Sequence, residues 1–474
     1  MELSKDLQAR QEARNLAAAA ETAQKTLANM EQPQLDAITE AMAKAFSKEA
    51  ALLAELAVQE TGFGNVEDKI TKNRFASETV LSSIREMKTV GILHERDNLW
   101  EIGVPVGVIA AIVPSTNPTS TVCYKSLIAL KAGNAIVFSP HPKAIACTRK
   151  AVQIVAEAAE KAGAPKGSIA CLTIPSLDGC QELMKAPQVK LILATGGPAM
   201  VRAAYSSGKP AIGVGAGNGP AYIHHSADIL KALSAIARSK TFDYGTVCAS
   251  EQSIIVEKQL EQPVIAEGQR QGFYFMNPQE AAQLAKLLFR PNGTLNPEIV
   301  GKSALVLAQK AGFSVPNSTR VLVAREQEAG PTRPYSMEKL CPVLAFFVMD
   351  SEESVLQKCI EVLNHEGTGH TFAIHAEDKA VIRRFALNIP VSRFLVNTPA
   401  ALGGIGATTQ LAPALTLGCG AVGGSSSSDN IMPMHLINIR RVAWDTEAKA
   451  APPKAAANSE LVELLTQKIM ERLG

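Results

Sequence analysis

The sequence predicts an α/β protein with two doubly wound domains and a β-hairpin arm. The chain has 474 residues, of which 46% are hydrophobic and 19% charged, so it can bury more than one core. From residue 108 onward, short apolar runs alternate with amphipathic helical segments, which is typical of parallel sheets covered by helices. Before that alternation, two extended runs flank a polar turn at residues 95–98 and predict the hairpin.

The elements follow in a clear order along the chain. Helical periodicity with few breakers marks residues 1–90, and the extended runs at about 89–107 predict an arm suited to subunit contact. We expect a first domain to end near residue 226 and a second to span 227–420. The stretch 421–445 returns to the first domain and ends in a strand, LINIRRVAW, expected to support oligomerisation.

The composition changes sharply after this strand. Residues 446–458 form an Ala/Pro/Lys linker of low complexity that cannot bury a core. Residues 459–474 predict an amphipathic helix with one apolar stripe at three- and four-residue spacing. A tail or a clasp between subunits is one interpretation. The other is a docking peptide that inserts this stripe into a groove on a partner.

Bulk properties exclude several functional classes. A formal charge of +2 without a basic stripe predicts neither a nucleic-acid nor a membrane partner. Residues 1–25 lack the apolar core of a signal peptide, so we expect a cytoplasmic protein. The eight cysteines show no CxxC spacing and are interpreted as reduced thiols. No cluster has the spacing of metal ligands, and no metal is predicted.

Cys248 is the cysteine whose surroundings suit chemistry. It lies in FDYGTVCASEQSIIVE, on a glycine-containing loop between a helix ending near Asp243 and a strand beginning near Ser253. A thiol at such a junction is open to substrate and to backbone N–H groups. A lone cysteine is more often a small core residue, so the position alone does not make it a nucleophile.

Five ordered segments carry a resemblance to a known family. They are PSTNPTSTVCYKSLIALKAGNAIVFSPHP, LATGGPAMVRAAYSSGKPAIGVGAGNGPAYI, FDYGTVCASEQSIIVE, EKLCPVLAFF and GTGHTFAIH. Over residues 1–445 the chain resembles the aldehyde dehydrogenase superfamily, and within it the coenzyme A-acylating branch. The resemblance implies the aldehyde dehydrogenase fold, with a first domain that binds NAD and a second that is catalytic.

The resemblance implies that Cys248 is the nucleophile and Asn117 the oxyanion-hole amide. Addition of a thiolate to an aldehyde produces an alkoxide, which requires donors where the negative charge develops. The Asn117 side chain and the Cys248 backbone N–H are the expected donors. Without the resemblance, Asn117 is better interpreted as a turn residue before Pro118.

The resemblance also places a nicotinamide cofactor on the first domain. The strand LILAT ends at glycines that permit close approach of a phosphate, and the FSPHP segment follows a strand in the same way. Glu338 matches a carboxylate that holds the nicotinamide ribose in relatives, whereas a helix glutamate exposed to solvent is the alternative. The expected cofactor residues are Ser139, His141, Thr195, Gly196, Gly197 and Glu338. NAD is expected because no obvious arginine site for a 2′-phosphate lies beside FSPHP.

The segment GVGAGNG bears on the acyl acceptor. It is not a Rossmann fingerprint, because Asn218 replaces the third glycine and a strand follows it, so we expect a tight turn near the active site. Hydrolytic relatives carry a water-activating glutamate where Val214 stands in this chain. Coenzyme A, a better nucleophile than water, is therefore the expected acceptor. His370 in GTGHTF is either an acid/base group assisting that thiol or a structural histidine.

The sequence thus predicts NAD-dependent oxidation of propanal or acetaldehyde to its acyl-coenzyme A. The alternatives are a hydrolytic aldehyde dehydrogenase that releases a free acid and a non-catalytic assembly component. The linker and terminal helix resemble encapsulation peptides of bacterial microcompartments, although relatives often carry that peptide at the N-terminus. We therefore expect 459–474 to bind a shell protein, and the enzyme to form a homodimer or tetramer inside a microcompartment.

Overall fold

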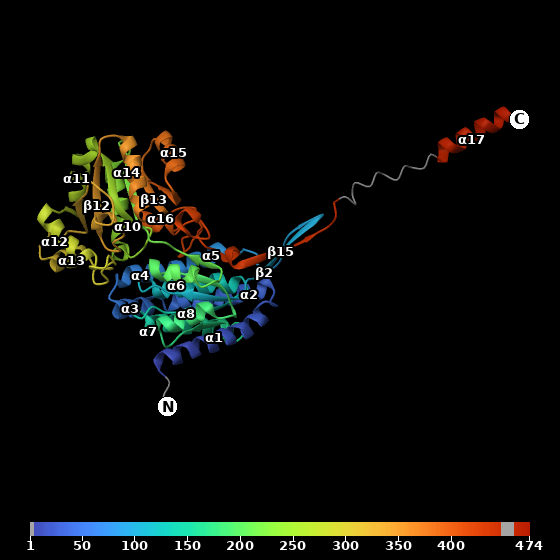
Figure 1. Cartoon of the computed structure of the whole chain (residues 1–474), viewed down its shortest axis with the longest axis horizontal. Coiled ribbons are helices and arrows are strands. Elements are labelled where there is room, and N and C mark those ends of the chain that lie inside the picture. Colours follow the sequence, from blue (N-terminus) through green and yellow to red (C-terminus); the bar gives the residue numbers. More distant parts are fainter. Residues whose placement is uncertain (1–3, 447–458) are drawn as a thin grey trace.

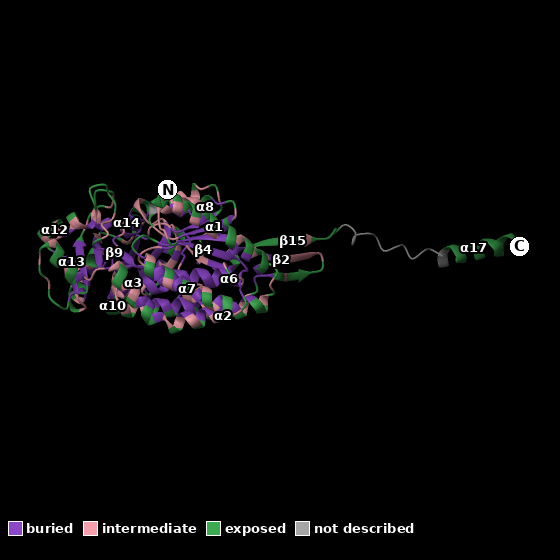
Figure 2. Ribbon diagram, turned by 90° about the horizontal axis from the view of Figure 1, so that it is seen from below, coloured by how far each residue is buried: buried purple, intermediate pink, exposed green. Residues whose placement is uncertain are grey.

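A computed structural model describes residues 4–446 and 459–474, and it confirms the α/β architecture. Two parallel sheets, each covered by helices, form the body of the molecule, and a three-stranded sheet projects from it (Figure 1). Buried residues are concentrated in the two large sheets and on the inner faces of their helices (Figure 2). The predicted linker, apart from residue 446, lies outside the described residues.

The chain begins with helices, as predicted for residues 1–90. Along the first helix the buried positions are mostly alanines three or four residues apart, such as Ala9, Ala13 and Ala17, which permits close packing. These elements are α1 (Lys5–Leu27), α2 (Gln32–Lys48), α3 (Ala50–Thr61), α4 (Val66–Arg74), the π-helical turn η1 (Phe75–Thr79) and α5 (Val80–Ile84).

The first large sheet has five parallel strands in the order β5-β4-β3-β6-β7. All residues of β3 and β4 are buried, which explains why they read as continuous apolar runs. The strands are β3 (Val108–Ile112), β4 (Ala135–Ser139), β5 (Ile169–Cys171), β6 (Val189–Ala194) and β7 (Ala211–Gly213). The helices are α6 (Pro118–Lys131), α7 (Ile145–Lys161), α8 (Leu177–Lys185) and α9 (Pro198–Tyr205).

The second large sheet has seven strands in the order β10-β11-β12-β9-β8-β13-β14. The strands are β8 (Gly219–Ile223), β9 (Glu251–Glu257), β10 (Phe273–Phe275), β11 (Val321–Arg325), β12 (Val343–Met349), β13 (Gly369–His375) and β14 (Val391–Val396). The helices are α10 (Ile229–Thr241), α11 (Glu261–Arg270), α12 (Pro278–Leu288), α13 (Ala304–Ala311), α14 (Glu352–His365), α15 (Lys379–Asn388) and α16 (Ala400–Gly404).

The position of β8 corrects one predicted boundary. The sequence predicts that the first domain ends near residue 226, but β8 pairs with β9 and β13 inside the second sheet. The chain therefore passes between the domains before Gly219. A short apolar run carries no information about which of two sheets it joins, so the sequence could not place this strand.

The hairpin arm is present and gains a third strand from the far end of the sequence. β1 (Gly91–Arg96) pairs with β2 (Leu99–Pro105), and β15 (Ile437–Ala443) pairs with the other edge of β2, all antiparallel. Most residues of β1 and β15 are exposed, and this sheet extends away from the body (Figure 1). Its outer surface is available for contact with another subunit.

The predicted terminal helix is α17 (Ser459–Leu473). Its apolar side chains from Val462 onward are exposed, from 53% for Leu465 to 82% for Leu473. An apolar stripe on a surface helix normally packs against something, so this exposure marks a candidate binding face. In the described part of the chain, no helix combines the length and the apolar character needed to cross a membrane.

Candidate active site

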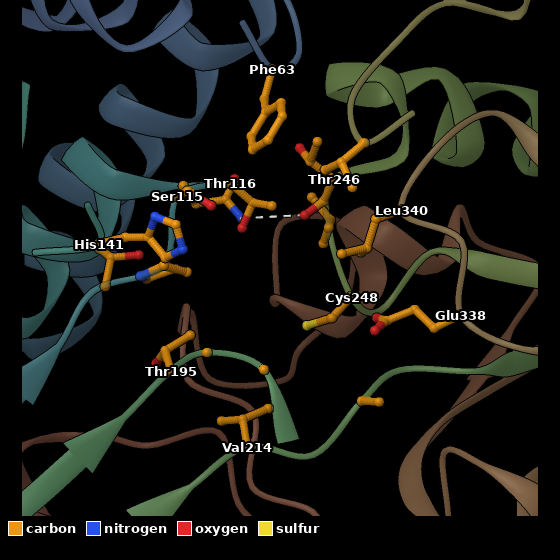
Figure 3. Close-up of a pocket in the computed structure, with 18 of the residues that line it drawn as sticks. Phe63, Ser115, Thr116, His141, Thr195, Val214, Thr246, Cys248, Glu338 and Leu340 are labelled. Atoms are coloured by element: carbon orange, nitrogen blue, oxygen red, sulfur yellow. Dashed lines mark hydrogen bonds between the residues drawn. The ribbon is translucent and has the colours of Figure 1, made fainter. Parts of the chain in front are cut away.

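One cavity of about 570 Å³ brings together seven of the nine predicted site residues. Its wall comes from both domains, with Thr195 and His141 on one side and Cys248 and Glu338 on the other (Figure 3). The seven are Asn117, His141, Thr195, Gly196, Gly197, Cys248 and Glu338, whereas Ser139 and His370 are not on the wall. Residues 53 to 131 positions apart in the sequence, such as Asn117, Thr195 and Cys248, thus line the same cavity.

Cys248 sits on a short loop between a turn and the sheet. A 3₁₀ turn, Phe242–Gly245, follows α10, and β9 starts three residues after the cysteine. The thiol is half-buried and is the one cysteine on the cavity wall. Burial, with the neighbouring Glu338 carboxylate and Cys419, raises the pKa of Cys248 to about 12. In the free enzyme the Cys248 sulfur is therefore a protonated thiol. It must lose its proton before it can act as a nucleophile.

Asn117 occupies the N-cap position of α6, with Pro118 in the first turn. Its side chain makes no capping hydrogen bond to the helix, so the amide is free for other contacts. Its Nδ2 donates to the carbonyl oxygen of Thr246 at 3.2 Å, two residues before Cys248. The amide thus bridges the loop after β3 to the cysteine loop, which is more than a turn residue requires.

The opposite end of the cavity is suited to a phosphate-bearing cofactor. Gly197 is the N-cap of α9, which has no side-chain cap, so its first backbone N–H groups have no side-chain partner. The hydroxyl of Thr195 is buried and has no hydrogen-bond partner among the described residues. His141 lines the same end. Ser139 does not, because it is buried at the end of β4 and its side chain is hydrogen-bonded with Cys180.

Glu338 lies in a loop rather than on an exposed helix, and its carboxylate faces the cavity near Cys248 (Figure 3). Its Oε1 accepts a hydrogen bond from the backbone N–H of Gly217 at 3.0 Å. Burial and the adjacent Glu366 raise the pKa of Glu338 to about 8. This carboxylate therefore changes its charge within the range where most enzymes work.

The glycine-rich segment forms the predicted tight turn. It connects β7, which ends at Gly213, with β8, which starts at Gly219. Val214 and Gly215 line the cavity, and Gly217 lies against the backbone of Cys248. The wall at Val214 is therefore apolar and carries no carboxylate.

His370 is placed differently from the other predicted residues. It is fully buried in β13, and its Nδ1 is hydrogen-bonded with the Thr371 hydroxyl at 2.8 Å. Burial, together with the nearby Arg393, lowers the pKa of His370 to about 3. Such an imidazole is neutral and a weak base, and it is not on the cavity wall, so these observations do not support general base catalysis by His370. Its catalytic role stays a prediction.

Several residues of the cavity were not predicted from the sequence. Lys72 on α4, Phe63 before that helix and Thr246 beside the cysteine all line it. Lys69 and Lys72 share one face of α4 at a spacing of three residues, which is a weak signal because charged helix faces usually meet solvent. Both side chains are only 3% exposed.

A second cluster, remote from this cavity, consists of His224, His225 and Glu257, whose potential ligand atoms lie within 4.8 Å of one another. The backbone N–H of Ser226 donates to Nδ1 of His224 at 3.2 Å, so the neutral ring carries its proton on Nε2. The Nε2 atom of His224 lies 3.8 Å from a carboxylate oxygen of Glu352. The absence of a metal therefore stays a prediction.

Comparison with known proteins identifies the family. A model of the aldehyde dehydrogenase family matches residues 5–271. The bifunctional aldehyde-alcohol dehydrogenase of Escherichia coli strain K12 is 44% identical over 432 residues, covering 90% of this chain and 48% of that protein. The chain thus spans about half the length of this curated relative.

Solved structures match nearly the whole chain. An acetylating aldehyde dehydrogenase from Geobacillus thermoglucosidasius has a TM-score of 0.92 and 51% identity, covering 94% of this chain and 98% of that one. A propionaldehyde dehydrogenase from a Clostridium phytofermentans fucose utilisation microcompartment has a TM-score of 0.82 and 30% identity, covering 90% and 96%.

A propionaldehyde dehydrogenase from Rhodopseudomonas palustris, with bound coenzyme A and an acylated cysteine, has a TM-score of 0.82 and 28% identity, covering 91% of this chain and 97% of that one. These structures agree with the family model, which matches more than half of the sequence. The cysteine cavity between two α/β domains therefore belongs to a member of the aldehyde dehydrogenase family.

Proposed function

We propose that this chain oxidises a short aldehyde on Cys248 with NAD and transfers the acyl group to coenzyme A. The observation that carries the proposal is the shared cavity. Cys248, Asn117 and the apolar side chain of Val214 line it, and so does Gly197, the N-cap residue of α9, whose first turn has no side-chain cap. The relatives named as acetylating or propionaldehyde dehydrogenases support the same reaction class.

The first step is addition of the Cys248 thiolate to the aldehyde carbon. The carbonyl oxygen becomes an alkoxide, which the Asn117 amide and the Cys248 backbone N–H stabilise. Loss of one such donor typically lowers the rate by about a hundredfold or more. The carbon then loses a hydride and becomes a thioester on Cys248.

The cofactor end of the cavity would hold NAD through the N–H groups at Gly196 and Gly197 and the unpartnered hydroxyl of Thr195. When bound, the nicotinamide ring supplies the hydride acceptor that no side chain provides. Lys143 also lines this end and is the cation that a 2′-phosphate would meet. A comparison of NAD with NADP therefore belongs in the assay.

The second step is attack of the coenzyme A thiolate on the Cys248 thioester, which releases the Cys248 thiolate and forms the acyl-coenzyme A. Water competes poorly because Val214 provides no base beside the thioester. Glu338 also lines the cavity, but one of its oxygens is engaged by Gly217.

A steady-state assay tests the proposal. NADH formation from two-, three- and four-carbon aldehydes is followed with and without coenzyme A, and the product is identified by mass spectrometry. We expect turnover to require coenzyme A, to favour acetaldehyde or propanal, and to vanish in Cys248→Ala. A full rate without coenzyme A would show a hydrolytic enzyme. Unchanged turnover in Cys248→Ala would instead point to a non-catalytic assembly component.

We further propose that the arm formed by β1, β2 and β15 joins subunits into a homodimer or tetramer. Exposed apolar side chains on this arm, Ile92 and Ile439 at 38% each, support the assignment. Light scattering during gel filtration gives the mass. A monomer at micromolar concentration would contradict this proposal.

For α17 we propose docking to the shell of a bacterial microcompartment in the cytoplasm. The exposed apolar side chains of the helix support it, and one structural relative comes from a microcompartment. A chain ending at Trp444 should no longer co-purify with shells while its aldehyde turnover stays unchanged. Retention of the shortened chain in shells would reject the proposal.

A further inference from the structure

The ammonium group of Lys72 contacts the side-chain amide of Asn117, the proposed oxyanion-hole donor. The side chain lines the cavity but is only 3% exposed. Its Nζ donates to Oδ1 of Asn117 at 2.5 Å, to Oδ2 of Asp243 at 2.5 Å and to the Thr246 hydroxyl at 3.0 Å. An ammonium has three N–H donors, so these contacts use all of them.

The contact with Lys72 decides how the Asn117 amide is oriented. An amide presents an acceptor at Oδ1 and two donors at Nδ2, and the two ends are similar in shape. Turning the amide around would bring its NH₂ group against the ammonium of Lys72, where both groups are donors. The ammonium therefore holds Oδ1 toward Lys72 and leaves Nδ2 on the side of the cysteine loop, where it donates to the Thr246 carbonyl oxygen and to the Thr116 hydroxyl, both at 3.2 Å. Polarisation of Oδ1 by the cation also strengthens Nδ2 as a donor.

Asp243 holds Lys72 in place through a backbone conformation that few residues adopt. Asp243 and Tyr244 have φ of 49° and 50°, two consecutive left-handed residues that are not glycine. The Asp243 carboxylate is fully buried and accepts from both Lys69 and Lys72, while its Oδ1 accepts from the Asn65 backbone N–H at 2.9 Å. Surroundings that fix such a conformation often mark a functional position.

Gly64 completes this enclosure. Its φ is +74°, a left-handed value that glycine adopts freely because it carries no β-carbon. A β-carbon at this position would lie 1.7 Å from Oδ1 of Asp243. The carboxylate is therefore confined by Gly64 at Oδ1, while both lysines contact Oδ2.

We propose that Lys72 is a positioning residue for aldehyde oxidation: it fixes the Asn117 amide with Nδ2 directed at the oxygen that becomes the alkoxide. Asp243 holds the Lys72 ammonium at the required point. The inference rests on the function proposed above. It differs from a purely structural ion pair, because the same ammonium contacts both the buried carboxylate and the amide of the cavity.

Lys69 provides a matched control on the same helix. Its side chain is also 3% exposed, and it donates to the same Oδ2 of Asp243 at 2.8 Å. Its other partner is the carbonyl oxygen of Thr116 at 2.9 Å, and it is not on the cavity wall. Lys69→Met thus removes one cation from Asp243 but leaves the Lys72–Asn117 contact.

The test is a double-mutant cycle on the full-length enzyme with propanal, NAD and coenzyme A. Lys72→Met should lower kcat at least tenfold more than Lys69→Met, with smaller changes in KM. In an Asn117→Ala background, Lys72→Met should have an effect of less than about threefold, because the amide it positions is gone. Alkylation of Cys248 by iodoacetamide, which needs no oxyanion hole, should stay within twofold of wild type.

The thermal stability of each variant is measured, so that a loss of kcat can be separated from a loss of folding. If Lys72→Met does not fold, Lys72→Gln retains one donor toward Oδ1 of Asn117 and should be less impaired than Lys72→Ala at equal thermal stability. Equal losses in Lys69→Met and Lys72→Met, or additive effects of Lys72→Met and Asn117→Ala, would overturn the inference. An inactive wild type would instead reject the proposed function.

Discussion

The α-carbon of Gly217 lies against the carbonyl group of Cys248, and a β-carbon built on it would be 1.8 Å from the Cys248 oxygen. The turn between β7 and β8 can therefore approach the cysteine loop only without a side chain at this position. The same turn presents the Gly217 N–H to Glu338. One small residue thus sets the spacing between the cysteine loop, the turn and the carboxylate.

Gly217→Ala should displace the cysteine loop and abolish most aldehyde turnover. Overpacking of this kind typically destabilises a protein by about 1–3 kcal/mol. Gly215→Ala is the matched control, because its β-carbon would lie 3.7 Å from Cys419 Sγ, an ordinary contact. Thermal unfolding and alkylation of Cys248 are the measurements. Equal melting temperatures for the two variants would contradict the close approach at Gly217.

Glu338→Gln should speed alkylation of Cys248 at alkaline pH. The ionised Glu338 carboxylate raises the pKa of Cys248, and the pKa of Glu338 is about 8, so its charge is present mainly above that pH. The variant should match wild type near pH 7 and react several times faster near pH 9; one pKa unit corresponds to about a tenfold change. Iodoacetamide rates across pH 6–10 measure this. A constant ratio would show that Glu338 does not influence the thiol.

Thr195→Val should weaken cofactor binding without destabilising the fold. The buried Thr195 hydroxyl has no partner among the described residues, so its removal forfeits no hydrogen bond of the free protein. Loss of one hydrogen bond to NAD should raise its Kd about five- to tenfold. Ser126→Ala removes another such hydroxyl away from the cavity and should leave the Kd unchanged. Isothermal titration calorimetry provides both values.

Acid should destabilise the protein through two buried histidines. Burial lowers the pKa of His370 to about 3 and that of His375 to about 4, whereas the unfolded chain takes up protons near pH 6.5. The free energy of folding that each neutral histidine contributes is therefore fully present above pH 6.5 and is lost as the pH falls toward 4. Each histidine should contribute a slope of about 1.4 kcal/mol per pH unit in that window.

Urea titrations between pH 7 and 4.5 measure this slope. His375→Gln should reduce it by the contribution of one proton, whereas replacement of the exposed His94 should leave it unchanged. An identical pH dependence in His375→Gln and wild type would show that His375 does not carry the predicted effect.

His370→Gln tests whether His370 acts as an acid/base group in acyl transfer. A buried neutral imidazole outside the cavity wall should not produce an inflection in the rate of acyl transfer between pH 6 and 8. We expect the pH profile of the variant to keep its shape even if its rate falls. Loss of an inflection near pH 6–7 would restore the acid/base interpretation.

The fold was largely predictable because its strands are continuous apolar runs and its helices carry regular apolar stripes. Runs such as residues 108–112 and 135–139 are buried on both faces, so every position is apolar and the pattern is unmistakable. Membership of a particular sheet depends on pairing across the chain, which is why β8 was assigned to the wrong domain.

The site was predictable where a motif marks it and unpredictable where burial alone creates it. Thr195 and Cys248 stand at the junctions of strands with turns, which the sequence displays. Lys72 and Asp243 are 171 positions apart, and each resembles an ordinary surface charge until the fold buries both. Ser139 matched its motif but points toward Cys180, since one rotation about a strand end decides which way a side chain faces.

The pairing of β2 with β15 imposes an order on biosynthesis. β2 is made early, but its second partner is separated from it by the remainder of both domains. Until residues 437–443 have left the ribosome, one edge of β2 has no strand to pair with and can recruit the wrong one. A nascent chain therefore has to synthesise its whole catalytic sheet before the arm can close, and assembly of subunits through that arm must wait until residues 437–443 can pair with β2.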